Sequence, residues 1–344
     1  MRVWLDALTP KQLLFSEYIM RRGAGAHTFL FTSRRYREVE ELARIRDLKP
    51  VYVGKFGGGE LASKLDASLE RAALLSGIVQ EFGPDISVSF CSPEAARVSF
   101  GLTVPHIAFC NSPHAEAACR LSIPLCARLL IPRHIPRSAV SVYGLDPSRI
   151  TQYGALDEAA IIKNPPVPWD PQAAGIRPGR PTILLRTYET QASYVHRATD
   201  IGAIISALAE HFPRHNIVVS GRYPHQIRDL RNSHNTRCVV LEGTVDGGAL
   251  LGRCDLFVGS GGTMTTEAVL RGIRTISYQA VPTLGESYLV DQGAMRRART
   301  PSDIVGEAEH LLGIDATVFQ KRAARMLAKM EDPYDILEEQ MAGV

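Results

Sequence analysis

Residues 255–270 read Asp-Leu-Phe-Val-Gly-Ser-Gly-Gly-Thr-Met-Thr-Thr-Glu-Ala-Val-Leu and constrain the fold more than any other stretch of the chain. The apolar run Leu-Phe-Val stops at Gly259, and small residues follow as far as Gly262. Apolar residues then recur at helical spacing, as Met264 and Ala268 illustrate. The pattern predicts a short strand, a glycine turn and a helix that begins at the turn.

This predicted turn has the properties of an anion site. The N–H groups at a helix N-terminus are unpaired and carry the positive end of the helix dipole, and glycines let a phosphate approach the backbone. Glu267 lies about one turn into the helix, where its carboxylate can accept two hydrogen bonds from the hydroxyls of a ribose. The alternative is a plain glycine-rich turn followed by an exposed glutamate. The residues that we expect to bind a nucleotide diphosphate and its ribose here are Gly259, Ser260, Gly261, Gly262, Thr263 and Glu267.

Two better-known phosphate motifs fail on these residues. A Gly-x-Gly-x-x-Gly fingerprint that starts at Gly259 needs a glycine where Met264 stands, and the strand expected at 275–279 ends without an acid to hold a ribose. The Gly-Lys-Ser/Thr of a P-loop is absent from the whole sequence. These residues therefore form neither a dinucleotide fingerprint nor a P-loop.

The composition adds few constraints. The 344 residues include 45% hydrophobic and 22% charged side chains with a formal net charge of +3, which is compatible with two domains that have separate cores. Basic residues are interleaved with acids instead of forming a run, so we expect no nucleic-acid partner. No apolar stretch approaches the ~20 residues that span a bilayer, and the N-terminus lacks a signal-peptide pattern. We expect a cytoplasmic protein, with peripheral attachment to the inner membrane face through residues 121–135 as an alternative to burial of that stretch.

Cysteine and histidine spacing gives no sign of a metal. The six cysteines never form Cys-x-x-Cys, the sequence has no Asp-x-Asp, and no His-x-x-x-His pair falls on a predicted helix. We therefore expect buried thiols, no bound metal and no cofactor.

Strands and helices alternate along both halves of the chain, which predicts parallel α/β sheets. Periodicity disappears between residues 163 and 181, where six prolines gather, and we place the linker there. The predicted domains are residues 1–165 and 166–344, with the last helix free to pack back on the first domain. Both domains are expected to be Rossmann-like and to meet at a cleft, because ligands bind at the carboxyl ends of parallel strands.

Residues 111–116, Asn-Ser-Pro-His-Ala-Glu, follow a predicted buried strand in the N-terminal half. His114 is a candidate general base and Glu116 a candidate acid to orient it. A proline-led helix start capped by Ser112 explains the same residues and is compatible with the catalytic interpretation. Glu94 follows another predicted strand end and is a third candidate catalytic residue.

Several further residues at predicted strand ends are weaker candidates. Thr9, Lys11 and Asn111 can contact a phosphate or an acceptor, although a solvated first-turn lysine is the more common case. Arg186 can neutralise a leaving diphosphate, or it can simply pair with Glu189.

Residues 260–268, Ser-Gly-Gly-Thr-Met-Thr-Thr-Glu-Ala, resemble the nucleotide-sugar motif of the GT-B superfamily. In that superfamily glycines line the diphosphate and the glutamate holds the ribose, so the resemblance implies these roles for the 259–263 turn and for Glu267. The glutamate offset is similar to that of the lipid-linked N-acetylglucosaminyltransferase of peptidoglycan synthesis, and it is one residue longer than in non-hydrolysing UDP-N-acetylglucosamine 2-epimerases. The resemblance implies an α/β, GT-B-like fold with two Rossmann-like domains whose parallel sheets face each other across a cleft.

Over nearly its full length the chain also resembles an archaeal family of proteins of unknown function, the domain-of-unknown-function family number three-five-four. Residues 3–12, 88–98 and 111–117 are the most family-like. The family name carries no activity.

The chain departs from the characterised enzymes mainly in its N-terminal half. The transferase has a glycine-rich loop ending in histidine after its first strand, where this chain has Thr9-Pro10-Lys11-Gln12. Epimerases have a His-Arg-Arg-Glu-like segment after the first strand of the second domain, where this chain has Arg-Thr-Tyr-Glu at 186–189. The acceptor site and the catalytic base therefore cannot be carried over.

Three functions follow from these observations. The first is a metal-independent glycosyltransferase of the hexosyl type that uses a UDP-sugar as substrate and a sugar or lipid-linked acceptor. The second is a sugar-nucleotide 2-epimerase, in which Glu94 and Glu116 would supply the two acids. The third is a nucleotide-sugar-binding protein without catalysis. The sequence does not indicate an oligomeric state.

Overall fold

A computed structural model describes residues 1–188, 200–234, 237–278 and 283–344 of the chain. The chain divides into two compact units. Unit 1 contains Met1–Asn164 together with Met330–Val344, and unit 2 contains Pro165–Lys329. The chain thus leaves unit 1 where the proline-rich stretch starts, and its last helix returns to unit 1.

Unit 1 is built on a seven-stranded sheet in which every described pairing is parallel. Its spatial order is β3-β2-β1-β4-β5-β6-β7. The strands are β1 (Arg2–Ala7), β2 (Thr28–Arg35), β3 (Val51–Lys55), β4 (Ile86–Ser89), β5 (His106–Phe109), β6 (Arg128–Pro132) and β7 (Ile150–Tyr153).

Helices connect these strands, as a parallel sheet requires. They are α1 (Pro10–Arg22), α2 (Arg37–Ile45), α3 (Leu61–Phe82), α4 (Pro93–Gly101), α5 (Glu116–Ser122), α6 (Ser138–Ser141), α7 (Glu158–Ile161) and the returning α15 (Pro333–Ala342), with short turns η1 (Ile123–Leu125) and η2 (Pro147–Arg149). The strands β1, β4 and β5 are buried almost throughout, which explains their continuous apolar runs.

Unit 2 repeats this plan with a six-stranded parallel sheet of order β10-β9-β8-β11-β12-β13. Its strands are β8 (Thr182–Arg186), β9 (Asn216–Ser220), β10 (Val239–Leu241), β11 (Leu256–Gly259), β12 (Arg274–Tyr278) and β13 (Arg296–Ala298). Its helices are α8 (Ile201–His211), α9 (Pro224–His234), α10 (Gly247–Leu251), α11 (Thr263–Leu270), α12 (Leu284–Asp291), α13 (Pro301–Leu312) and α14 (Ala316–Leu327).

Each sheet has one point where the strand order reverses. In unit 1 the chain builds outwards from β1 to β3 and then continues on the other side of β1 with β4. In unit 2 the same reversal separates β8 from β11. Ligands of open parallel sheets bind outside the carboxyl ends of the strands at such a reversal. The ends of β1 and β4, and of β8 and β11, are therefore the places to look for function.

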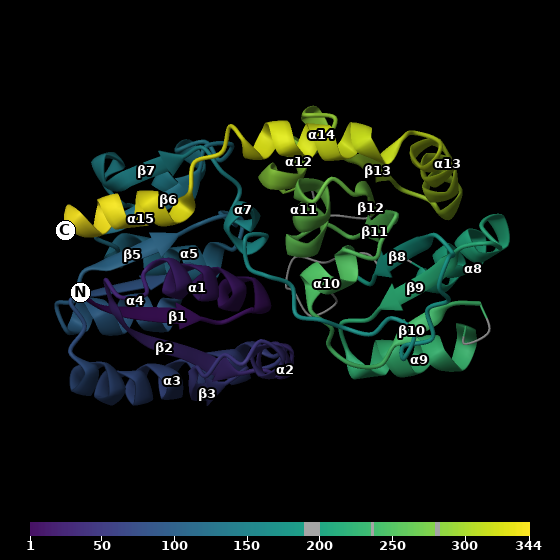
Figure 1. Cartoon of the computed structure of the whole chain (residues 1–344). Coiled ribbons are helices and arrows are strands. Elements are labelled where there is room, and N and C mark those ends of the chain that lie inside the picture. Colours follow the sequence, from purple (N-terminus) through teal and green to yellow (C-terminus); the bar gives the residue numbers. More distant parts are fainter. Residues whose placement is uncertain (189–199, 235–236, 279–282) are drawn as a thin grey trace. The chain divides into compact units, whose positions relative to one another are not determined.

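Helix α15 is anchored to unit 1 by polar contacts and by its apolar face. Asp332, which caps α15, accepts hydrogen bonds from Arg22 Nη1 and Lys163 Nζ, each at 2.8 Å. Leu337 is fully buried in the main core of unit 1. Figure 1 shows α15, in yellow, running beside β6 and β7, and a contact between Gln340 and Thr151 of β7 ties it there.

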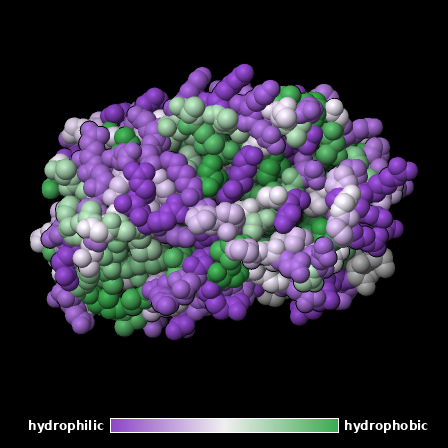
Figure 2. All heavy atoms as spheres, in the orientation of Figure 1, coloured by the Kyte–Doolittle hydropathy of each residue, from purple (hydrophilic) through white to green (hydrophobic). Residues whose placement is uncertain are grey.

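Helix α3 carries an exposed apolar stretch that was not predicted from the sequence. Leu61, Leu65 and Leu69 of α3 are 81%, 59% and 62% exposed, and Figure 2 shows the corresponding hydrophobic surface over α3.

The stretch 121–135, in contrast, is mostly interior, because β6 and η1 within it place their apolar side chains in the core. This favours the buried alternative for that stretch. Within the described residues, no helix is both long and apolar enough to cross a membrane.

His106 of β5 is a fully buried titratable group. One ring nitrogen lies 2.7 Å from Ser87 Oγ and the other 3.1 Å from Ser89 Oγ, so neutral imidazole is satisfied inside the sheet. Burial lowers the pKa of His106 from its usual 6.5 to about 4.

The free energy of unfolding should therefore fall as the pH drops from 6.5 to about 4, because within this window the unfolded chain binds a proton at His106 that the folded chain does not. The loss from this group is about 3 kcal/mol, at about 1.4 kcal/mol for each unit of pKa difference. Denaturant titrations at several pH values give the free energy of unfolding at each pH. The slope of this free energy against pH should be shallower for His106→Gln than for the parent. The exposed His310→Gln is the matched control, and equal slopes for the parent and His106→Gln would contradict this prediction.

Candidate functional site

The turn between β11 and α11 lies at the strand-order reversal of unit 2. Gly261 and Gly262 have φ angles of 88° and 82°, in the left-handed region that favours glycine. Gly259 is glycine for a different reason, since a Cβ there would lie 2.7 Å from Thr265 Oγ1 and would also collide with the buried Phe257 ring. The turn can form only because these positions lack side chains.

The N-terminus of α11 differs from the other helix N-termini described in unit 2. Helices α8, α10, α12, α13 and α14 each begin with an Asp or Thr side chain that accepts a hydrogen bond from their first turn. Helix α11 begins after Gly262, which has no side chain to do so, and a Cβ at Gly262 would meet no atom within 4 Å. No side chain of the described residues therefore accepts hydrogen bonds from the first turn of α11, where the positive end of the helix dipole lies.

Glu267 lies one turn into α11 and is buried, with 5% of its side chain exposed. Its Oε2 lies 3.9 Å from Arg271 Nη2, an ion pair between the i and i+4 positions. The sequence analysis gave an exposed glutamate as the alternative at this position, and the burial of Glu267 excludes it. A buried carboxylate and an uncapped helix N-terminus therefore occur within one turn of each other.

Arg186 ends β8, the strand beside β11. Its Nη1 donates to Ser220 Oγ at 2.6 Å and to Gly221 O at 2.9 Å, and its own carbonyl accepts from Tyr278 Oη at 2.8 Å. Arg186 is thereby fixed to the ends of β9 and β12. Its other expected partner, Glu189, lies outside the described residues.

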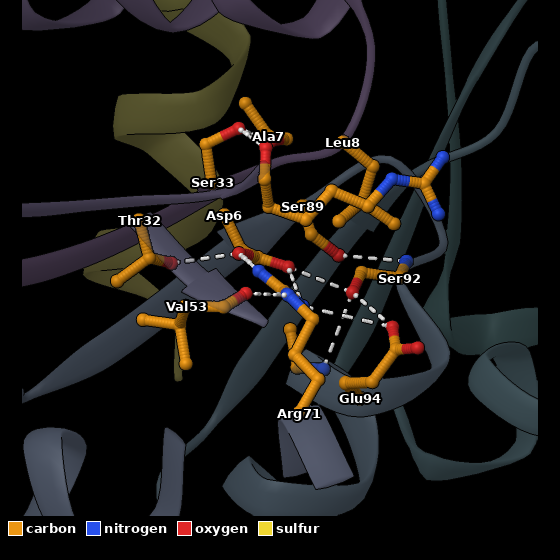
Figure 3. A network of polar contacts seen from close by, with 12 residues as sticks. Asp6, Ala7, Leu8, Thr32, Ser33, Val53, Arg71, Ser89, Ser92 and Glu94 are labelled. Carbon is orange, nitrogen blue, oxygen red and sulfur yellow. Dashed lines mark hydrogen bonds and ion pairs between the residues drawn. The ribbon is translucent and has the colours of Figure 1, made fainter. Parts of the chain in front are cut away.

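The strand-order reversal of unit 1 holds a buried polar network (Figure 3). Asp6 of β1 accepts hydrogen bonds from Arg71 Nη2 at 2.5 Å and Nη1 at 3.1 Å. Thr32 Oγ1 and Ser92 Oγ each donate to the same carboxylate at 2.7 Å. Burial alone would raise the pKa of Asp6, but the Arg71 guanidinium outweighs burial and holds the pKa below its usual range. The pair is therefore ionised within the core.

Glu94, one of the predicted catalytic residues, belongs to this network. Its Oε2 lies 3.7 Å from Arg71 Nη1 and accepts from Ser92 Oγ at 3.3 Å. Glu94 is 8% exposed, close to the end of β4. Glu94 was predicted from the sequence, whereas Asp6 and Arg71 were missed. Asp6 could have been found from the sequence, because it lies near the end of the first predicted strand. Arg71 lies in the middle of α3, and nothing in the sequence around it indicates a place in this network.

A second network joins two other predicted residues to acids that were not predicted from the sequence. Lys11 Nζ lies 2.7 Å from Asp157 Oδ2 and 2.9 Å from Glu158 Oε1, and Asn111 Nδ2 donates to Asp157 at 2.7 Å. Burial alone would lower the pKa of Lys11, but the two carboxylates raise it above its usual range. Thr9 caps α1 through Gln12 N. The structure brings Lys11 and Asn111 together at Asp157. The alternative that Lys11 is a solvated lysine in the first turn of the helix is wrong.

The loop with His114 and Glu116 precedes and begins α5. Glu116 is the first residue of α5 and pairs with Arg120 Nε at 2.7 Å on the exposed face, which agrees with the helix-start interpretation. The expected cap is wrong, however, because Ala115 occupies the N-cap position and the Ser112 hydroxyl donates to Asn111 Oδ1. His114 is exposed in the preceding turn, and partial burial lowers the pKa of its imidazole below the usual value.

Comparison with known proteins places the whole chain in one family. The family model described as "Protein of unknown function (DUF354)" matches residues 1–343. The chain belongs to the DUF354 family. The uncharacterized protein MJ0665 of Methanocaldococcus jannaschii is 27% identical to it, over 99% of this chain and 98% of that protein.

Solved structures share the architecture of this DUF354 protein over its full length. The UDP-GlcNAc 2-epimerase of Neisseria meningitidis, bound to UDP-GlcNAc, matches with a TM-score of 0.74 and 14% identity over 100% of both chains. The spinosyn forosaminyltransferase SpnP matches with a TM-score of 0.64 and 18% identity over 99% of both chains. At these identities the likeness shows the fold, and it confirms the predicted α/β, GT-B-like class with two Rossmann-like units.

Gly259→Ala should destabilise the protein, because the added methyl group collides with Phe257 and Thr265 in a packed core. The expected loss in the free energy of unfolding is about 1–3 kcal/mol, as for other overpacked sites. Gly306→Ala in α13 is the matched control, since a Cβ there meets nothing within 4 Å and alanine favours a helix. Chemical denaturation of both variants tests this, and a Gly259→Ala protein as stable as the parent would contradict the close packing of the turn.

Proposed function

We propose that this DUF354 protein is an enzyme that binds a nucleotide sugar at the turn between β11 and α11 and transfers the sugar to an acceptor. One observation carries the proposal: an uncapped helix N-terminus, approached by two left-handed glycines, lies at the strand-order reversal together with the buried Glu267. Each part matches one part of a nucleotide sugar. Backbone N–H groups suit a diphosphate, and a carboxylate suits the hydroxyls of a ribose.

In this proposal the turn contributes most of the catalysis. Transfer of the sugar leaves a nucleoside diphosphate whose negative charge grows as the glycosidic bond breaks. The amides of Ser260, Gly261, Gly262 and Thr263 would stabilise that charge, and such preorganised donors act most strongly on the transition state. Neither a metal nor another cofactor is required for this step. Arg186 would act indirectly, by fixing the neighbouring strand ends.

An acceptor hydroxyl must also lose a proton. Glu94, His114 and Glu116 are the proposed bases, and their surroundings differ. Glu94 is buried beside Arg71, whereas Glu116 is exposed and paired with Arg120. Lys11, Asn111 and Thr9 remain proposed contacts for a phosphate or for a sugar or lipid-linked acceptor.

The choice of UDP rests on the comparisons. The crystal structure of the Neisseria epimerase contains UDP-GlcNAc. The crystal structure of a UDP-GlcNAc 2-epimerase from Methanocaldococcus jannaschii contains UDP-GlcNAc and UDP. SpnP, in turn, is a forosaminyltransferase. A UDP-sugar is therefore the first substrate to test on this chain.

Epimerisation at C2 is the second proposed function, and the full-length similarity to epimerases favours it. Such an enzyme needs acids on both faces of the sugar, with Glu94 and Glu116 as the proposed pair. Binding without catalysis is the third possibility and is compatible with the N-terminal departures from both enzyme classes.

Glu267→Ala should weaken UDP binding about 10-fold or more, because hydrogen bonds to a charged group contribute roughly 1.5–3 kcal/mol. Isothermal calorimetry with UDP measures the effect, with Glu309→Ala as a control on an exposed glutamate of the same unit. Melting temperatures of both variants separate lost binding from lost folding. Unchanged affinity in a folded Glu267→Ala protein would refute the ribose role.

Incubation with UDP-N-acetylglucosamine in deuterated water separates the two proposed reactions. A transferase leaves the C2 hydrogen in place and consumes the nucleotide sugar only when an acceptor is added. An epimerase exchanges that hydrogen with solvent, because it must break and remake the C2–H bond. We expect no deuterium at C2 by mass spectrometry, and incorporation would reject transfer in favour of epimerisation.

A further inference from the structure

Three cysteine thiols converge in the core of unit 1, although they are far apart in the sequence. Cys91 follows β4, Cys110 follows β5, and Cys119 lies in α5. Their Sγ atoms all lie within 4.8 Å of one another, and all three residues are buried. The proposed reaction uses none of them.

The fold brings these thiols together by specific means. Strands β4 and β5 are neighbours in the sheet, so the residues that follow them emerge side by side at one edge. Cys91 has a φ angle of 46°, an unfavourable conformation for a residue with a side chain. Cys119 is 1% exposed on the buried side of α5. A strained backbone therefore holds one of the three thiols in place.

The spacing of the thiols suits a single metal ion. Zinc binds thiolates at about 2.3 Å in a tetrahedral arrangement, which places the sulfur atoms about 3.8 Å apart. Cys110 Sγ and Cys119 Sγ are 4.0 Å apart, close to that spacing. A disulfide needs an S–S distance of about 2.05 Å, so these two thiols are not bonded to each other, and all three cysteines are free.

A tetrahedral zinc ion needs a fourth ligand, and His114, in the loop before α5, is the candidate. His114 lies between Cys110 and Cys119 in the sequence, but its ring nitrogens are not within 4.8 Å of all three sulfur atoms, so the imidazole has to turn towards the thiols when the ion binds. Tyr143 Oη donates a hydrogen bond to the carbonyl of Pro113, which holds the loop beside the cluster. Three cysteines and one histidine form a common ligand set of structural zinc sites.

We propose that Cys91, Cys110 and Cys119 bind one Zn²⁺ ion, with His114 as the fourth ligand. Binding forms three Zn–S bonds and one Zn–N bond, and the three thiol protons pass to solvent. The ion links the ends of β4 and β5 to α5, and so stabilises the edge of the sheet from which the loop of residues 111–116 emerges. Zinc binding also removes His114 from the proposed bases, because its metal-bound nitrogen cannot accept a proton. This proposal replaces the expectation that the protein binds no metal.

Zinc titration of the full-length, chelator-treated protein tests the site. Elemental analysis after dialysis should find about one Zn²⁺ per chain in the parent and a small fraction of that in Cys91→Ser, Cys110→Ser and Cys119→Ser. His114→Ala should bind Zn²⁺ more weakly in competition with a chromogenic chelator. Cys126→Ser is the matched control, since Cys126 is buried in the same apolar cluster but hydrogen-bonds to Ser122 O outside the three-thiol group. Absence of Zn²⁺ from the parent, or equal binding by the parent and Cys91→Ser, would overturn the proposal.

A spectroscopic measurement on the parent protein covers the case in which the variants do not fold. Co²⁺ in place of Zn²⁺ should give intense visible bands typical of tetrahedral coordination and a near-ultraviolet thiolate-to-metal charge-transfer band. Weak bands of octahedral Co²⁺ without the charge-transfer band would overturn the site. Neither result depends on UDP binding, so the zinc site and the proposed function can fail separately.

Discussion

Parallel pairing of the strands is the constraint on which the rest of this structure depends. Because every described pairing within each sheet is parallel, the carboxyl ends of the strands gather at one edge of each unit. The order reverses between β1 and β4 in unit 1 and between β8 and β11 in unit 2, and the connections on either side of a reversal lead to opposite faces of the sheet. Such a divergence of loops is the reason that ligands of open parallel sheets commonly bind at these points. The α11 N-terminus and the Asp6 network both lie there.

The groups that lie at the two strand-order reversals differ. In unit 2 the β11–α11 turn presents backbone amides beside one buried carboxylate, an arrangement suited to a flexible, anionic ligand that brings its own charge. In unit 1 the charges are already paired, as in Asp6 with Arg71 and Lys11 with Asp157. Removing one member of such a buried pair leaves an unpaired charge that costs about 3–5 kcal/mol. These groups are thus rigid and preorganised, which suits the positioning of a reacting group.

Individual residues show how far sequence reasoning reached. The order of the elements from β1 to β5 and the β11–α11 turn could be predicted, because apolar runs and glycines act over a few neighbouring residues. Arg71 could not, since it meets Asp6 only after α3 has packed across β1 and β3. Asp157 was missed for the same reason, because its partner Lys11 is far away in the sequence. The cysteines were judged by their spacing along the chain, which carries no information about thiols that meet at the end of two neighbouring strands.

The sequence by itself determined the strand and helix pattern, the parallel class of the sheets, and the glycines and the glutamate of the 259–267 segment. These depend on local backbone preferences and on the periodicity of apolar side chains. Only the tertiary structure decided that Glu267 is buried, that Lys11 is held by two acids, and that three thiols converge beside β4 and β5. Burial and charge pairing depend on which elements pack together, and residues distant in the chain meet only when the sheet has formed.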